Sequence, residues 1–174
     1  MINRPDLDFR VGFGFDSHPL TTGRRLVLGG VEIPHGRGLA GYSDGDVLVH
    51  AIMDALLGAA NLGDKGVHFP SGDIQYKDIS SLLLLTKVGA LLDDAGWRVS
   101  NLDATITAQQ PRLAPFIKGM QEQTAKALSL PSGRISIKAT TTDHLGFVGR
   151  EEGIAAYAVA SIVSAHEPEQ AIIQ

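Results

Sequence analysis

The stretch Tyr42–Asp64, YSDGDVLVHAIMDALLGAANLGD, predicts a polar turn followed by a buried helix. The turn SDGD offers Ser43 or Asp44 as the N-cap, and the apolar residues that follow recur at helical spacing. His50 and Asp54 are four residues apart, so they lie on one face of that helix. A histidine and carboxylates are costly to bury unless other groups pair with them. The stretch therefore predicts a functional site built around one helix.

The composition is that of an ordinary folded protein. The chain has 174 residues, of which 44% are hydrophobic and 20% charged, and this length allows a sizeable core. We expect a single domain over residues 1–174, with a loose lead-in at 1–8 and a tail at 165–174. The net charge is −4, so the chain lacks the surplus of basic residues that nucleic-acid binding requires. The composition therefore argues against a general nucleic-acid-binding protein.

The cysteine count restricts the possible metal chemistry. Because the chain has no cysteine, disulfides, iron–sulfur clusters and thiolate zinc sites are excluded, and a metal must be bound by His, Asp and Glu. No cationic and then apolar leader opens the sequence, and no apolar stretch approaches the length of a membrane span. We therefore expect a soluble cytoplasmic protein without a membrane partner.

The remaining patterns predict a mixed order of strands and helices. Residues that alternate or are rich in β-formers predict strands at 9–15, 97–109, 134–142 and 153–164, with a further strand or a hairpin at 26–33. Helical spacing predicts two further helices, at 80–95 and 111–130. Segment 65–78 has no periodicity and reads as a lid or a linker. The last strand is small and apolar on both faces, so we expect one face in the core and the other against a second subunit.

Two short polar clusters follow predicted strands. In Asp16-Ser17-His18, positions i and i+2 point the same way, so both side chains could bind one ion; the alternative is an Asx-type turn with a surface histidine. With His50 they supply two imidazoles and a carboxylate, the ligand set of an open catalytic zinc site. The second cluster, three threonines before Asp143, places hydroxyls beside a carboxylate, unless it is only β-propensity followed by a turn.

Several segments together resemble the 2-C-methyl-D-erythritol 2,4-cyclodiphosphate synthases. These segments are GFDSH (14–18), GGVEIP (29–34), SDGDVLVHAIMDALLGAANLGD (43–64), HFP (68–70) and IKATTTDHLGFVGREEGIA (137–155). The resemblance is collinear from about Arg10 to Ser164. It implies an α+β fold, with a four-stranded mixed sheet, helices packed on one side, assembly as a homotrimer and active sites between subunits.

The resemblance implies a metal-dependent intramolecular phosphoryl transfer. The family converts 4-diphosphocytidyl-2-C-methyl-D-erythritol 2-phosphate to 2-C-methyl-D-erythritol 2,4-cyclodiphosphate and CMP, in non-mevalonate isoprenoid biosynthesis. We therefore expect a phosphorus–oxygen lyase. The nucleophile is an oxygen of the substrate's own 2-phosphate, so the protein's main tasks are to orient the phosphates and to neutralise their charge.

The resemblance also assigns two metals and a catalytic set. The family's zinc ligands fall on Asp16, His18 and His50. Its second divalent ion, Mg²⁺ or Mn²⁺, has its carboxylate ligand at Asp143. The expected catalytic residues are Asp143, Thr141, Thr140 and Asp54. Asp54 would support another site residue or a substrate hydroxyl.

The expected substrate-binding residues cover each part of the cytidine diphosphate substrate. Phosphate contacts are expected at Tyr42, Ser43, Thr140 and Thr141. Ribose and erythritol contacts are expected at Asp64 and Gly66, and the cytosine wall at Ala108, Arg112, Leu113 and Ala139. Phe69 and Phe147 belong to the same substrate-binding set, and Arg150 lies where the family can hold an isoprenoid diphosphate in the trimer core.

Three positions depart from the family's usual residues. Tyr42 stands where the family usually has a histidine beside the diphosphate, and a tyrosine cannot carry positive charge there. Asp143 stands in place of a longer glutamate, and Ser71 in place of an aspartate after Phe-Pro. These changes affect phosphate, second-metal and erythritol contacts, but none removes a zinc ligand.

Two other functions fit parts of the pattern. Metallophosphoesterases also begin their metal site with Asp-x-His after a strand, but they need a later Gly-Asn-His-type motif that this sequence lacks. A catalytically silent trimer that binds metal or nucleotide, and senses isoprenoid diphosphates through Arg150, would keep the same residues. Only a turnover measurement distinguishes such a silent trimer from an active enzyme.

Overall fold

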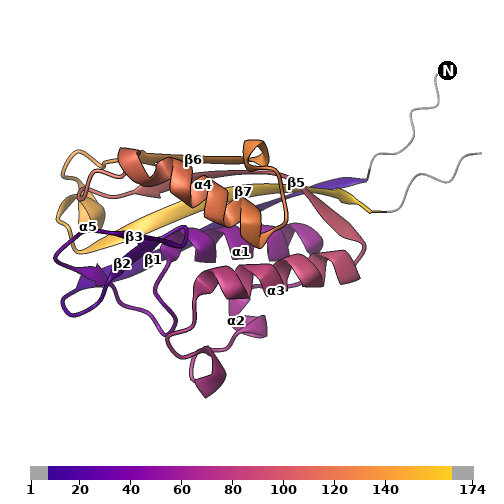
Figure 1. Ribbon diagram of the computed structural model, residues 1–174, viewed down its shortest axis with the longest axis horizontal. Coiled ribbons are helices and arrows are strands. Elements are labelled where there is room, and N and C mark those ends of the chain that lie inside the picture. Colours follow the sequence, from indigo (N-terminus) through magenta and orange to yellow (C-terminus); the bar gives the residue numbers. More distant parts are fainter. Residues whose placement is uncertain (1–7, 166–174) are drawn as a thin grey trace, which may run out of the picture.

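The computed structural model describes residues 8–165, which form an α+β fold around one mixed sheet (Figure 1). The sheet has five strands in the order β4-β1-β7-β5-β6, and only β5 and β6 run parallel. Their bounds are Gly38–Leu39 (β4), Phe9–Thr21 (β1), Gly153–Ser164 (β7), Trp97–Thr107 (β5) and Ile135–Thr140 (β6). The expected count of four strands is wrong by one, because the two-residue β4 pairs with the end of β1. The expected lead-in and tail lie outside the described residues, apart from Asp8 and Ala165.

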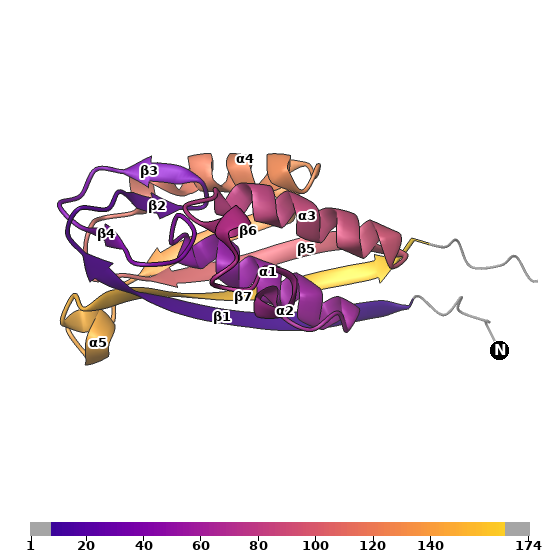
Figure 2. The ribbon, with the colours of Figure 1, turned by 90° about the horizontal axis from the view of Figure 1, so that it is seen from below.

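The three longer helices cover one face of this sheet, while the short α5 lies at its end (Figure 2). The helices are α1 (Val47–Ala60), α2 (Lys65–His68), α3 (Ser81–Asp94), α4 (Ile117–Ala127) and α5 (Gly146–Gly149), with single 3₁₀ turns at Ile74–Tyr76, Ala114–Phe116 and Ser132–Arg134. A separate hairpin pairs β2 (Leu26–Leu28) with β3 (Val31–Ile33), the second of the two alternatives that the sequence left open for this segment. Helix α1 packs on β1 and β7, while α3 and α4 lie beside it on the same side (Figure 2). Within the described part of the chain, no helix has both the length and the apolar character needed to cross a membrane.

Several element ends differ from the sequence prediction for local reasons. Strand β1 continues to Thr21 because its pairing with β7 extends to Pro19, so Asp16 and His18 lie inside the strand. The helix expected over 111–130 is shorter, since a 3₁₀ turn containing Pro115 precedes α4 and Ser129 takes a left-handed φ of 53° after it. The aperiodic segment 65–78 contains α2 and one 3₁₀ turn.

Two glycines in β1 let α1 lie directly on the strand. Gly12 and Gly14 lie on the same face of β1 as Asp16 and His18, and this face points toward α1. A Cβ on Gly14 would lie 2.0 Å from the carbonyl oxygen of Ala51, and one on Gly12 would meet the next turn of the helix equally closely. This close packing brings the first turn of α1 over the adjacent polar residues of β1.

The N-cap of helix α1 is Asp46, and not Ser43 or Asp44 as predicted. The fully buried carboxylate of Asp46 accepts hydrogen bonds from the backbone N–H groups of Val49 (3.1 Å), Gly29 (2.9 Å) and Gly30 (2.7 Å). It therefore caps the helix and binds the β2–β3 turn at the same time. The prediction was wrong because the side chains of Ser43 and Asp44 bind other partners, which the site below includes.

The opposite face of the sheet carries large exposed apolar side chains, which we call the bare face. Its members are Phe9, Val11, Phe13, Phe15, Tyr157 and Val159. They form cross-strand neighbours, since Phe13 pairs with Val159 and Phe15 with Tyr157. The prediction that β7 has one face in the core is confirmed by its buried Ala156, Ala158 and Ala160, whereas the expected contact of its other face with a second subunit stays a prediction.

Candidate active site

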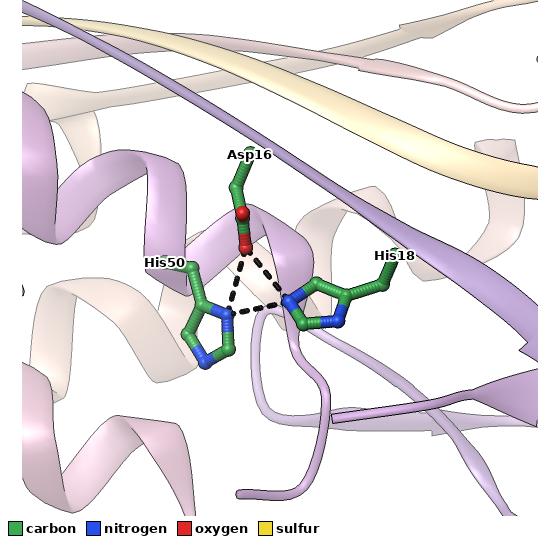
Figure 3. A group of neighbouring side chains, drawn as sticks. All are labelled: Asp16, His18 and His50. Atoms are coloured by element: carbon green, nitrogen blue, oxygen red, sulfur yellow. Dashed lines mark hydrogen bonds and ion pairs between the residues drawn. The ribbon is translucent and has the colours of Figure 1, made fainter. Parts of the chain in front are cut away.

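Three ligand atoms from β1 and α1 converge on one point (Figure 3). Asp16 Oδ2 lies 2.9 Å from His18 Nε2 and 2.9 Å from His50 Nδ1, and the two nitrogens are 3.1 Å apart. In a tetrahedral zinc site with bonds of about 2.0–2.1 Å, neighbouring ligand atoms are about 3.3 Å apart. The observed separations are close to that value. Within the described residues, this is the one group of at least three such side chains that could bind a metal ion.

The other ring nitrogens of both histidines have protein partners. His18 Nδ1 donates to the carbonyl oxygen of Ala40, which leaves Nε2 with its lone pair toward the site. His50 Nε2 lies 2.9 Å from Ser81 Oγ and 3.1 Å from Ser43 Oγ. Ser81 Oγ in turn donates to the carboxylate of Asp44 over 2.5 Å, so it accepts from His50. The lone pair of His50 Nδ1 therefore also points toward the site.

These contacts make the three converging atoms acceptors, which fits a cation. Three lone pairs about 3 Å apart repel one another unless a proton or a metal ion lies between them. Burial disfavours the charge on Asp16, but its contacts with the His18 and His50 rings, which need a shared proton when no metal ion is bound, and the charge of Lys65 outweigh burial and hold the pKa of Asp16 well below its usual range. Burial likewise opposes the charged form of His18, yet the contact with Asp16 raises the pKa of that histidine. The donor set and its polarity suit a divalent metal ion such as zinc, and the identity of the metal stays a prediction.

A lysine that the sequence analysis did not select lies next to the triad of Asp16, His18 and His50. Lys65 Nζ is 2.9 Å from Asp54 Oδ2 and 3.5 Å from Asp16 Oδ1, and the backbone N–H of Lys65 donates to Asp54 Oδ1 over 2.8 Å. Asp54 therefore shares the side of α1 that carries His50, as predicted. Lys65 was missed because it falls in a segment without periodicity, although its place directly after Asp64 is a usable signal.

The expected site residues fall mainly into two pockets. A pocket of about 170 Å³ contains the triad together with several expected substrate contacts: Tyr42, Ser43, Gly66 and Phe69, and also Lys65 and Ser71. A second pocket of about 410 Å³ contains Ala108, Arg112, Leu113, Ala139, Thr140 and Thr141, the expected cytosine wall and phosphate threonines. We call them the metal pocket and the base pocket. The structure thus brings these residues together in two pockets, and their contacts with a substrate stay predictions.

The other expected residues lie outside both pocket linings. Asp64 caps α2 by accepting from the N–H of Val67 over 3.0 Å. Asp143 is exposed, has a left-handed φ of 50°, and accepts from Thr141 Oγ over 3.2 Å. Arg150 forms an exposed ion pair with Glu152 (2.9 Å), and Phe147 is also exposed. The structure does not bring Asp143 to the triad, and its role at a second metal stays a prediction.

Comparison with known proteins connects this geometry to one family. Residues 9–163 match the YgbB family. The 2-C-methyl-D-erythritol 2,4-cyclodiphosphate synthase of Syntrophomonas wolfei is 62% identical over 156 residues, which cover 90% of this chain and 99% of that protein. The synthase of the same name from Moorella thermoacetica is 59% identical, over 88% of this chain and 94% of that one.

Solved structures agree in fold. The bifunctional IspDF of Campylobacter jejuni aligns with a TM-score of 0.88 and 41% identity over 92% of this chain, which spans 43% of that longer protein. The CDP complex of IspF from Plasmodium falciparum aligns with a TM-score of 0.79 and 27% identity, over 91% of this chain and 97% of the other. The family match over residues 9–163 spans the triad, and the synthases are 59–62% identical over most of the chain, so this chain belongs to the YgbB family of 2-C-methyl-D-erythritol 2,4-cyclodiphosphate synthases.

Proposed function

We propose that this chain converts 4-diphosphocytidyl-2-C-methyl-D-erythritol 2-phosphate to 2-C-methyl-D-erythritol 2,4-cyclodiphosphate and CMP, as a phosphorus–oxygen lyase. The convergence of Asp16, His18 and His50 in the metal pocket carries the proposal, because the named relatives are cyclodiphosphate synthases and this triad is the group suited to a metal. Such a reaction brings two phosphates together, so it needs positive charge at the point where they meet.

The residues of this chain have separate tasks in that reaction. A zinc ion held by the triad would act as a Lewis acid on a phosphate oxygen. Ser43 and Tyr42 border the same pocket and can donate hydrogen bonds to the diphosphate. The substrate supplies its own nucleophile, so the protein contributes orientation, which is worth about 7–11 kcal/mol in well-oriented intramolecular reactions. Asp143 would bind the second ion, Mg²⁺ or Mn²⁺, together with phosphate oxygens.

The distance between the two pockets supports a homotrimer with shared sites. Asp16 in β1 and Ala139 in β6 belong to the same row of the sheet, with Ala156 and Ile106 between them. Three strand spacings of about 4.8 Å separate their backbones by about 14 Å, and both intervening side chains are fully buried. A substrate cannot pass through that core. We infer that the base pocket of one copy serves the metal pocket of another, and that the bare face forms the contact between copies.

The deciding experiment is a turnover assay on the zinc-loaded protein with Mg²⁺. We expect release of CMP and a cyclic diphosphate, identified by phosphorus NMR. A His50→Ala variant removes one of the three metal ligands, so its turnover should fall by several orders of magnitude, while circular dichroism checks that the variant still folds.

Other products would contradict the proposal. Inorganic phosphate in place of the cyclic product would indicate a phosphoesterase. Tight binding of CDP without any turnover would indicate a silent nucleotide-binding protein. Equal turnover by the wild type and the His50→Ala variant would exclude the triad as the catalytic metal site.

A further inference from the structure

The ammonium group of Lys65 is the nearest fixed positive charge to the triad. It contacts Asp16 Oδ1 at 3.5 Å, on the carboxylate oxygen opposite the one that faces the two histidines. Asp54 holds it from the other side at 2.9 Å, and a second bond from the backbone of Lys65 to the same carboxylate fixes the start of α2. The position of this amine is therefore set by two carboxylates and by its own backbone.

The same group remains accessible to a ligand. The side chain of Lys65 is 28% exposed and borders the metal pocket, which also contains Tyr42 and Ser43. A lysine ammonium has three N–H donors. The described residues provide Nζ with two carboxylate partners, so one donor is left for a molecule in the pocket.

The local charge balance shows what the ammonium group of Lys65 contributes to the metal pocket. A divalent ion on the triad cancels the two negative charges of Asp16 and Asp54. Lys65 then leaves the pocket with one net positive charge, and without it the pocket would be neutral. Tyr42 borders the pocket at the position where the resemblance leads one to expect a charged histidine, and a tyrosine cannot supply that charge.

We propose that Lys65 is a phosphate-binding residue of the metal pocket, which contacts the phosphate group of the substrate that lies farther from cytidine. The inference rests on the proposed function, because it assumes that a cytidine diphosphate compound enters this pocket. Asp54 then acts as the positioning residue for Lys65, which corresponds to the first of its two expected roles, the support of another site residue. The contact is a charge-assisted hydrogen bond, worth about 10- to 100-fold in affinity.

Titration calorimetry with CDP and CMP on the zinc-loaded protein tests this role. CDP has the second phosphate and CMP lacks it, so the ratio of their affinities isolates the contact. Lys65→Met should lower the affinity for CDP by about 10- to 100-fold and leave the affinity for CMP nearly unchanged. Lys65→Arg should keep most of the CDP affinity. Lys126→Met removes a charge from an exposed lysine on α4 and should change neither value.

Two results would overturn the role of Lys65. If Lys65→Met binds CDP as tightly as the wild type, the amine does not contact a phosphate. If Lys65→Met loses zinc affinity, and the two nucleotides lose affinity by the same factor, Lys65 only orients Asp16. Failure of the wild type to form the cyclic product would instead count against the proposed function, and the comparison of CDP with CMP remains informative in that case.

Discussion

At the scale of single residues, each of the three ligating side chains is held by a second group. His18 bonds to a backbone carbonyl, His50 to Ser81, and Asp16 to Lys65. Partners of this kind fix the tautomer and the orientation of a metal ligand, and their loss typically costs 10- to 100-fold in metal affinity. The sequence pattern selected the three residues of the triad through their types and spacing. It could not identify Ser81, which reads as part of a helix cap and lies 31 positions from His50.

Ser81→Ala should therefore weaken zinc binding without unfolding the protein. The change leaves Asp44 and His50 Nε2 without the fully buried hydroxyl that joins them, so we expect zinc affinity to fall by about 10- to 100-fold. Competition with a chromophoric chelator measures this. Ser80→Ala is the matched control, because Ser80 makes no side-chain capping bond at the adjacent position. Equal zinc affinity in the wild type and in Ser81→Ala would show that Ser81 does not contribute to metal binding.

Asp46 gives a pH-dependent contribution to stability. Burial and the charge of Asp44 raise its pKa from 3.8 to about 6, despite three backbone hydrogen bonds to the carboxylate. Because the folded state then binds the proton more tightly than the unfolded chain, the contribution of Asp46 to stability is largest below pH 3.8 and declines as the pH rises to about 6.

Urea unfolding of the wild type and Asp46→Ala measures that contribution. At neutral pH the variant should lose about 2–4 kcal/mol, since three backbone N–H groups lose their acceptor. The difference between the two proteins should be larger at pH 4.5 than at pH 7, because other titrating groups cancel in the comparison. A difference that grows with pH would contradict the raised pKa.

At the scale of elements, the site depends on the close contact of α1 with β1. The sequence predicted both elements, because apolar residues recur at helical spacing in α1 and aromatic and β-branched residues dominate the start of β1. The sequence did not show how far β1 continues, since that depends on pairing with β7, far along the chain. The N-cap was also beyond local prediction, because Asp46 is selected by the distant turn at Gly29 and Gly30.

Gly14→Ala tests the contact between the two elements. The new Cβ would lie 2.0 Å from the carbonyl oxygen of Ala51, so α1 must move away from β1 and carry His50 away from Asp16. We expect a loss of roughly 1–3 kcal/mol or more in unfolding free energy, and a lower zinc affinity in the folded variant. Chemical denaturation and chelator competition measure the two effects.

Gly58→Ala is the control on the same helix. A Cβ at the exposed Gly58 meets no atom within 4 Å, and alanine favours a helix over glycine by about 1 kcal/mol. This variant should be at least as stable as the wild type, with unchanged zinc affinity. If both variants behave alike, the space between α1 and β1 is not what determines the site.

At the scale of the whole molecule, the bare face and the two separated pockets lead to the same assembly. The residues of the last strand are small and apolar, which indicated from the sequence that both faces of the sheet are covered. A pattern of side chains does not say what covers the second face. The family resemblance supplied a homotrimer. The structure adds the cross-strand aromatic and aliphatic pairs on β1 and β7 and a buried core between the pockets.

Phe13→Lys should dissociate the assembly. Phe13 is 64% exposed in the single chain and lies beside Val159, so a charge there would be buried at a contact between copies. Light scattering after size exclusion should show a trimer for the wild type and smaller species for the variant. The variant should also lose turnover but keep zinc affinity, since one chain supplies the whole triad. Leu83→Lys, on the exposed side of α3, should remain trimeric; a wild type that is already monomeric would contradict the assembly.

The triad also connects two distant parts of the chain, because Asp16 and His50 are 34 positions apart. An ion bound to both side chains would close that loop in the folded state alone, so the fraction of folded protein depends on the concentration of free zinc. A hundredfold excess of zinc over its dissociation constant adds about 2.7 kcal/mol, and each further tenfold adds about 1.4 kcal/mol. A chelator should lower the melting temperature of the wild type and leave that of His50→Ala unchanged. In a zinc-poor cell, the folded fraction of this protein, and with it its abundance, would therefore decrease.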